Sequence, residues 1–132
     1  MHGNYSKLIT AARKARLRAY APYSKFRVGA AVLTTGGKII TGCNIEISSL
    51  SLTICAERTA LFKAISENEK SFKALAIATD QTTPVPPCGA CRQVIYELAG
   101  DIDIILCPGR GKEKIMKLKS LLPLPFHKTS FF

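Results

Sequence analysis

"LTICAERTALF", residues 52–62, is the stretch that decides the fold, because a cysteine stands there two places before a glutamate as an apolar helical pattern begins. A second stretch, "PPCGACRQ" at residues 86–93, opens another helical pattern on Cys88 and Cys91. The free amides and the dipole at a helix N-terminus stabilise thiolates. Two helix starts that both carry cysteines therefore predict one shared site in the folded chain.

Around these stretches the sequence alternates between helical and strand patterns. Helices are predicted at residues 6–19, 54–66 and 88–98, and strands at residues 26–35, 38–45, 73–80 and 102–107, with a last strand and a short turn after Lys112. Gly36 and Gly37 suit the tight turn of a hairpin. Because parallel strands need helical crossovers, this order predicts an α/β fold with a mixed β-sheet of about five strands sandwiched by helices.

The length of 132 residues and the 47% hydrophobic content are those of one globular domain, so residues 1–132 are predicted to form a single domain. No repeat or linker-like tract divides the chain. The helix of residues 54–66 is expected to bury the following residues: Ala56, Ala60, Phe62, Ala64 and Ile65.

The cysteines and the apolar runs indicate where the protein works. Five cysteines are an odd number, and no charged-then-apolar leader precedes them, so a reduced, cytoplasmic setting is expected. No apolar run approaches the roughly 20 residues needed to cross a bilayer, so no membrane partner is expected.

The formal net charge of +10 raises the alternative of a nucleic-acid-binding protein. The basic residues concentrate at residues 13–18 and 110–119, and the first of these segments lies on the polar side of a helical pattern. Trp is absent, and no aromatic residues are interleaved with the charges as in stacking modules. A solvated basic face is therefore favoured over a nucleic-acid partner.

The cysteine spacing predicts a metal site. Cys88 and Cys91 are neighbours on one helical turn, and Cys55 at the other helix start supplies a third thiolate. Thiolates favour zinc among the divalent ions, and a site whose fourth position is open to water is catalytic. Glu57 is then the candidate acid–base group beside that water, while Arg58 and Arg92 offer charge to offset three thiolates.

A structural reading competes with this one. Glu57 on its own is also a residue that complements a helix dipole. Cys43 or Cys107 would complete a closed four-cysteine zinc site in a basic nucleic-acid-binding domain, although both cysteines are better assigned to structure. His2 and His127 belong to no Cys/His ligand motif.

Taken together, "YAPYSKFRVGAAV", "TGCNIE", "TICAERTALFKA", "PVPPCGACRQV" and "LLPLPF" resemble the short, homotetrameric, zinc-dependent cytidine deaminases of pyrimidine salvage, over roughly residues 5–126. The resemblance implies a three-layer α/β/α fold and hydrolysis of cytidine and deoxycytidine to uridine and deoxyuridine with release of ammonia. It implies one Zn²⁺ per chain on Cys55, Cys88 and Cys91, with Glu57 as the catalytic acid–base group. The expected partners are a nucleoside substrate and identical subunits.

The same resemblance assigns the remaining site residues. Phe26 would pack against the cytosine ring, and Phe126 would reach toward the site of a neighbouring subunit. Asn44 and Glu46 would hydrogen-bond the 3′-hydroxyl of the ribose. Ala56 would bind the substrate, and Arg58 would hydrogen-bond the ligand sulfurs.

One segment departs from the family pattern. After "NIE" the family has an Asn and, three places later, a Tyr, whereas this chain has Ile47 and Leu50. Altered tolerance on the sugar side of the substrate is therefore expected, since a lost hydroxyl removes a discriminating donor. Two related substrates remain alternatives, a nucleoside antibiotic such as blasticidin S and a base in a polynucleotide, the latter disfavoured because such editors usually carry His-x-Glu where this chain has Cys55.

Overall fold

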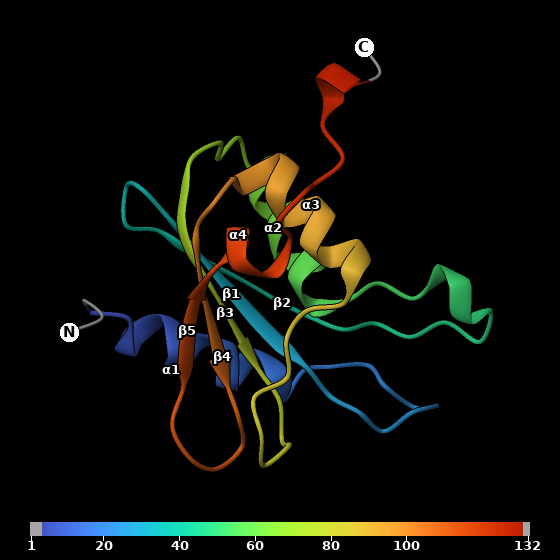
Figure 1. Ribbon diagram of the computed structural model, residues 1–132. Helices are drawn as coiled ribbons and strands as arrows, with labels where there is room; N and C mark the ends of the chain where they lie inside the picture. Colours follow the sequence, from blue (N-terminus) through green and yellow to red (C-terminus); the bar gives the residue numbers. More distant parts are fainter. Residues whose placement is uncertain (1–3, 131–132) are drawn as a thin grey trace.

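The structure, a computed structural model that describes residues 4–130, is built on a five-stranded sheet (Figure 1). The strands are β1 (Gly29–Thr34), β2 (Ile39–Cys43), β3 (Phe72–Ala78), β4 (Asp103–Cys107) and β5 (Lys114–Lys117). The helices are α1 (Ser6–Arg16), α2 (Ala56–Ser66), α3 (Gly89–Ala99) and α4 (Leu118–Leu121), with short 3-10 turns at Leu50–Leu52 and Lys128–Ser130. His2 lies outside the described residues.

The sheet is mixed, with the strand order β2-β1-β3-β4-β5. Strands β3 and β4 run parallel, joined by a crossover through α3, and the other neighbouring pairs are antiparallel. The predicted hairpin between β1 and β2 is confirmed, and Gly37 in its turn has a φ of 96°, a conformation that favours glycine.

Helices cover both faces of the sheet, as predicted. Helix α1 packs on one face, and α2, α3 and α4 lie on the other (Figure 1). The alternation along β3 explains the division, because Ala74 and Ala76 belong to the core under α1, whereas Leu75 and Ile77 belong to the core under α2 and α3. The α/β/α layering places the starts of α2 and α3 on one side of the sheet.

Two helix predictions need correction. Phe62 and Ile65 were expected in the core, but both are exposed on α2, and Leu61 and Glu57 are buried instead. The reason is that α2 has apolar residues on more than one face, so the pattern alone did not identify the face that meets the sheet. Helix α1 ends at Arg16, before the predicted residue 19. No helix within residues 4–130 combines the length and the apolar character needed to cross a membrane.

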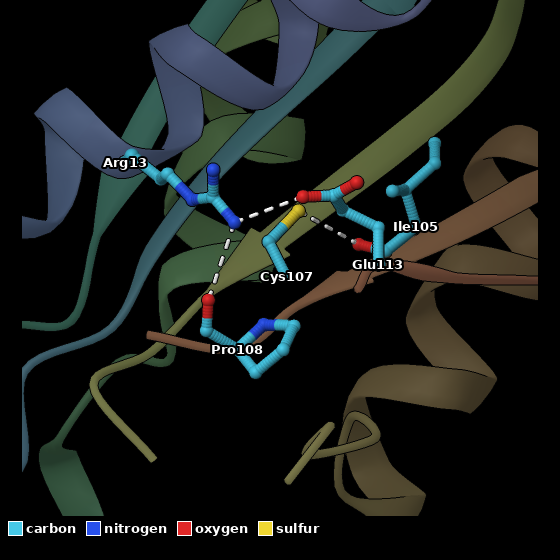
Figure 2. Close-up of polar contacts among 5 residues, drawn as sticks. All are labelled: Arg13, Ile105, Cys107, Pro108 and Glu113. Carbon is cyan, nitrogen blue, oxygen red and sulfur yellow. Dashed lines mark hydrogen bonds and ion pairs between the residues drawn. The ribbon is translucent and has the colours of Figure 1, made fainter. Parts of the chain in front are cut away.

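Cys107 lies in the core under α1. Beside it, the basic segments of residues 13–18 and 110–119 come into contact through Arg13 and Glu113 (Figure 2). Arg13 of α1 donates to the carbonyl oxygen of Pro108 at 3.2 Å and pairs with Glu113 at 3.0 Å. Burial raises the pKa of the Cys107 thiol to about 11, and its sulfur contacts the carbonyl oxygen of Ile105 at 3.7 Å. A buried, protonated thiol of this kind confirms the structural assignment of Cys107.

Candidate metal and active site

The three predicted ligands meet where α2 and α3 begin. Cys55 is the N-cap of α2, Cys88 is the N-cap of α3, and Cys91 lies in the first turn of α3. Their sulfur atoms all lie within 4.8 Å of one another. Tetrahedral zinc with Zn–S bonds of about 2.3 Å needs sulfurs roughly 3.8 Å apart, so small rotations of the side chains fit the three thiolates to zinc.

Arg58 and a neighbouring thiol stabilise negative charge on Cys55. The Nη2 atom of Arg58 donates to the sulfur of Cys55 at 3.5 Å, which is the contact expected of this arginine. The hydrogen bond from Cys91, supported by Arg58, lowers the pKa of Cys55 to about 5 despite its partial burial. The same contact, together with burial, raises the pKa of Cys91. The lowered pKa favours the thiolate form of Cys55, which is the form that binds a metal.

Arg92 has a different role from the one predicted. Its side chain contacts no ligand sulfur and instead donates from Nε to the carbonyl oxygen of Pro87 at 2.7 Å. From Nη1 it donates to the carbonyl oxygen of Leu121 at 2.9 Å. Arg92 thus connects the turn before Cys88 to the end of α4. The negative charge of the thiolates is then offset by the helix N-termini and Arg58.

Glu57 lies in the first turn of α2 and is only 5% exposed. Burial raises its pKa to about 7, and the nearby Cys55 acts in the same direction. Glu57, Cys55 and Cys88 line one cavity, so the carboxyl group and the ligand cluster face the same space. A carboxyl group with a pKa near neutrality is suited to accept and return protons.

The cavity has a volume of about 280 Å³ and is mostly apolar. Its lining includes Phe26, Asn44 and Ala56 from the predicted set. Its other lining residues were not singled out by the sequence: Val28, Thr53, Ile77, Thr79, Val85 and Pro86. Their places in the sequence gave some indication of this role, since Thr79 follows a buried strand and Val85 and Pro86 lie two to three residues before Cys88.

Two residues predicted to contact substrate lie outside the cavity of this chain. Glu46 is buried, and its carboxylate accepts hydrogen bonds from the backbone N–H groups of Tyr23 and Ser24. Phe126 is 61% exposed, and its backbone is paired with the side chain of Gln93. Ile47 and Leu50 are likewise exposed and do not line the cavity, so their effect on sugar tolerance stays a prediction.

A closed four-cysteine site is contradicted within residues 4–130. The three-sulfur cluster includes neither Cys43 nor Cys107. Cys107 lies under α1, on the opposite face of the sheet from α2 and α3. Because the cluster has three protein ligands and two of them, Cys55 and Cys88, line a cavity, the arrangement is that of a catalytic zinc site and not of a structural one.

Comparison with known proteins matches residues 3–107 to the family described as the cytidine and deoxycytidylate deaminase zinc-binding region. A cytidine deaminase of Sporosarcina psychrophila is 53% identical over 123 residues, which cover 92% of this chain and 90% of the relative. The crystal structure of cytidine deaminase from Burkholderia pseudomallei matches with a TM-score of 0.88 and 45% identity, covering 91% of this chain and 97% of that one. A blasticidin-S deaminase of Bacillus cereus is more distant, at 32% identity over 78% of this chain and 79% of the relative.

Proposed function

The chain belongs to the cytidine and deoxycytidylate deaminase family, and from this premise we propose that it catalyses the zinc-dependent hydrolytic deamination of cytidine and deoxycytidine. The products are uridine or deoxyuridine and ammonia. The observation that carries the proposal is that Glu57 lines one cavity together with Cys55 and Cys88, two members of the three-cysteine cluster.

The zinc ion, when bound by Cys55, Cys88 and Cys91, supplies a Lewis acid that makes water a nucleophile at neutral pH. Glu57 accepts a proton from the water that attacks C4 of the cytosine ring and delivers a proton to N3. It then delivers the second proton to the amino group, so that the C4–N4 bond breaks and ammonia leaves. A raised pKa suits Glu57 to this shuttle, because each transfer must be reversible near neutral pH.

The rest of the cavity binds and orients the nucleoside. We place the cytosine ring against Phe26, near Ala56 at the start of α2. Asn44 lies at the cavity wall where the ribose would extend, and Arg58 keeps charge on the ligand Cys55. The mostly apolar lining lowers the local dielectric constant, which strengthens the electrostatic interactions of Glu57 with the reacting atoms.

The assembly is proposed to be a homotetramer in which neighbouring chains complete each other's sites. Phe126 is exposed and lies outside the cavity of its own chain, and the exposed Phe62 and Ile65 provide apolar surface on α2. The cytoplasm is the proposed location and pyrimidine salvage the proposed role. All five cysteines are free, which supports a reducing compartment.

Blasticidin S is the second candidate substrate. The relationship to a blasticidin-S deaminase favours including it, as do the exposed apolar side chains of Ile47 and Leu50 where the family has polar ones. A cytosine nucleoside carrying a larger sugar substituent would contact such a surface.

The test is ammonia release from cytidine, deoxycytidine and blasticidin S by the zinc-loaded protein and by a Glu57→Gln variant. We expect deamination of the two simple nucleosides and a loss of at least about a hundredfold in kcat for Glu57→Gln, as for removal of an acid–base group. The zinc content should not change. Glu67→Gln, the same substitution at the exposed C-terminal end of α2, is the control. A fully active Glu57→Gln variant would contradict the mechanism, and wild-type activity on blasticidin S alone would favour the second candidate.

A further inference from the structure

The loop between β3 and α3, residues 79–87, forms one wall of the cavity and is here named the wall loop. Its residues Thr79, Val85 and Pro86 line the cavity, and Cys88 follows it directly. The wall loop has no helix or strand of its own, and three of its nine residues are prolines, which have no N–H group to donate. Its position therefore depends on contacts that other parts of the chain make with its two ends.

The chain that leaves β4 holds the first end of the wall loop. Strands β3 and β4 are parallel, with Ala78 opposite Cys107, so the segments that follow them lie at the same edge of the sheet. The backbone N–H of Thr79 donates to the carbonyl oxygen of Cys107 at 3.1 Å. The backbone N–H of Gly109 donates to the carbonyl oxygen of Gln81 at 2.8 Å. These two bonds extend the pairing of the strands into the wall loop.

Gly109 permits this contact because it has no side chain. A Cβ atom at this position would lie 2.8 Å from the carbonyl oxygen of Asp80 and 3.0 Å from the Cα atom of the same residue. Both are backbone atoms, so a side chain here would displace the start of the wall loop. The turn that contains Gly109 is also bonded to α1, since Arg13 donates to the carbonyl oxygen of Pro108 (Figure 2).

Arg92 holds the second end of the wall loop. Its Nε atom donates to the carbonyl oxygen of Pro87, directly before Cys88, at 2.7 Å. Its Nη1 atom donates to the carbonyl oxygen of Leu121 at 2.9 Å, so the guanidinium group is itself fixed from α4. Two separate nitrogen atoms of one planar group make these bonds, and the single ammonium nitrogen of a lysine does not reproduce that geometry.

The wall loop is thus fixed at both ends, and Val85 and Pro86 lie between them. We propose that Gly109 and Arg92 are positioning residues, which hold the wall loop against the bound nucleoside and hold Cys88 in place for the metal. The part of the proposal that concerns the nucleoside rests on the proposed function. Arg92 would then act on the site without contact to a ligand sulfur.

Arg92→Lys and Arg92→Met separate positioning from an effect of the positive charge, because only lysine keeps that charge. Positioning predicts that both variants raise the KM for cytidine about tenfold, the effect of one lost hydrogen bond, with kcat per bound zinc ion unchanged. If Arg92→Lys matches the wild type and Arg92→Met does not, Arg92 acts through its charge and the proposal is overturned.

The rate of zinc release tests the hold on Cys88 without any measurement of activity. Gly109→Ala and Arg92→Met should each lose zinc to a chelator about tenfold faster than the wild type, as when a group that orients a metal ligand is removed. Gly36→Ala is the control, because its Cβ would meet only the Thr34 hydroxyl oxygen at 3.8 Å. Release at the wild-type rate from both variants would overturn the proposed hold on Cys88.

Amide hydrogen exchange in the zinc-loaded protein shows which end of the wall loop is loosened. Gly109→Ala should exchange faster at residues 79–83 and Arg92→Met at residues 85–88, with exchange in the β1–β2 hairpin unchanged. Unchanged exchange in the wall loop of both variants would overturn the proposal whatever the kinetics. If Gly109→Ala does not fold, the two Arg92 variants decide the proposal. If the wild type releases no ammonia from cytidine or deoxycytidine, the proposed function fails, while zinc release and exchange still decide whether Gly109 and Arg92 hold the loop.

Discussion

At Gly42, the absence of a side chain lets the ligand-bearing helix α2 lie directly against β2. A Cβ atom at this position would lie 2.4 Å from the backbone nitrogen of Ala60 and 2.8 Å from the carbonyl oxygen of Ala56. These are backbone atoms of α2, so they can move away only if the whole helix shifts. Gly42 therefore helps to set the distance between the sheet and the helix that carries Cys55 and Glu57.

We predict that Gly42→Ala displaces α2, destabilises the protein by about 2 kcal/mol and lowers the zinc content. Urea denaturation and the metal-to-protein ratio measure the two effects. Gly36→Ala is the matched control, because its Cβ would meet only the Thr34 hydroxyl oxygen at 3.8 Å, an ordinary contact. Equal stability and zinc content in both variants would show that α2 tolerates the displacement.

Single residues differ in how far the sequence could identify them. Cys55, Cys88 and Cys91 were predicted because ligand chemistry and helical spacing are both local properties. The hydrogen bonds of Glu46 with the backbone of Tyr23 and Ser24 were not, because these residues lie more than twenty positions away and their approach depends on the folded path of the chain. The direction of Arg92 was missed for the same reason.

At the scale of elements, helix α3 holds the C-terminal segment in place. The Nε2 atom of Gln93 donates to the carbonyl oxygen of Phe126 at 2.7 Å, and the backbone N–H of Phe126 donates to Oε1 of Gln93 at 3.3 Å. Arg92, which directly precedes Gln93 on α3, donates a hydrogen bond to the carbonyl oxygen of Leu121 in α4. The helix that supplies two zinc ligands therefore also positions the segment that presents Phe126.

We predict that Gln93→Glu loosens the C-terminal segment without loss of zinc, because a carboxylate cannot donate to the carbonyl oxygen of Phe126. Limited proteolysis should cleave residues 122–130 faster than in the wild type. The Michaelis constant for cytidine should rise about tenfold, the effect of one lost hydrogen bond. Glu97→Gln, at an exposed position of α3, is the control. Unchanged proteolysis would mean that other contacts hold the segment.

The order and type of most elements could be predicted from the sequence because each has its own periodicity, and some are bounded by glycine, as at Gly36 and Gly37 between β1 and β2 and at Gly100 after α3. The faces of the elements were harder to predict. Phe62 and Ile65 are apolar at helical spacing and yet exposed, because periodicity identifies an apolar face and not the surface that covers it. The proposed subunit contacts would give these residues the burial that the isolated chain does not.

At the scale of the whole molecule, the site of one chain lacks a residue that the resemblance assigns to it. Glu57 faces the cavity of its own chain, whereas Phe126 is exposed and outside that cavity. The two residues would then serve different cavities in a symmetric assembly, because an exposed segment can complete the site of a neighbour. A Glu57→Gln chain would lose catalysis in its own cavity, whereas a Phe126→Ala chain would impair catalysis in the cavity of its neighbour.

Mixed assemblies test this division of labour. We predict that unfolding and refolding Glu57→Gln and Phe126→Ala chains together yields more activity than the sum of the two separate preparations. With random pairing, about a quarter of all cavities would contain an intact Glu57 and receive an intact Phe126. Light scattering establishes that the mixture forms the same oligomer as the wild type, and Glu67→Gln replaces Phe126→Ala in a control mixture. If Phe126 acted within its own chain, the mixture would give only the average of its two components, because no cavity would then hold both intact residues.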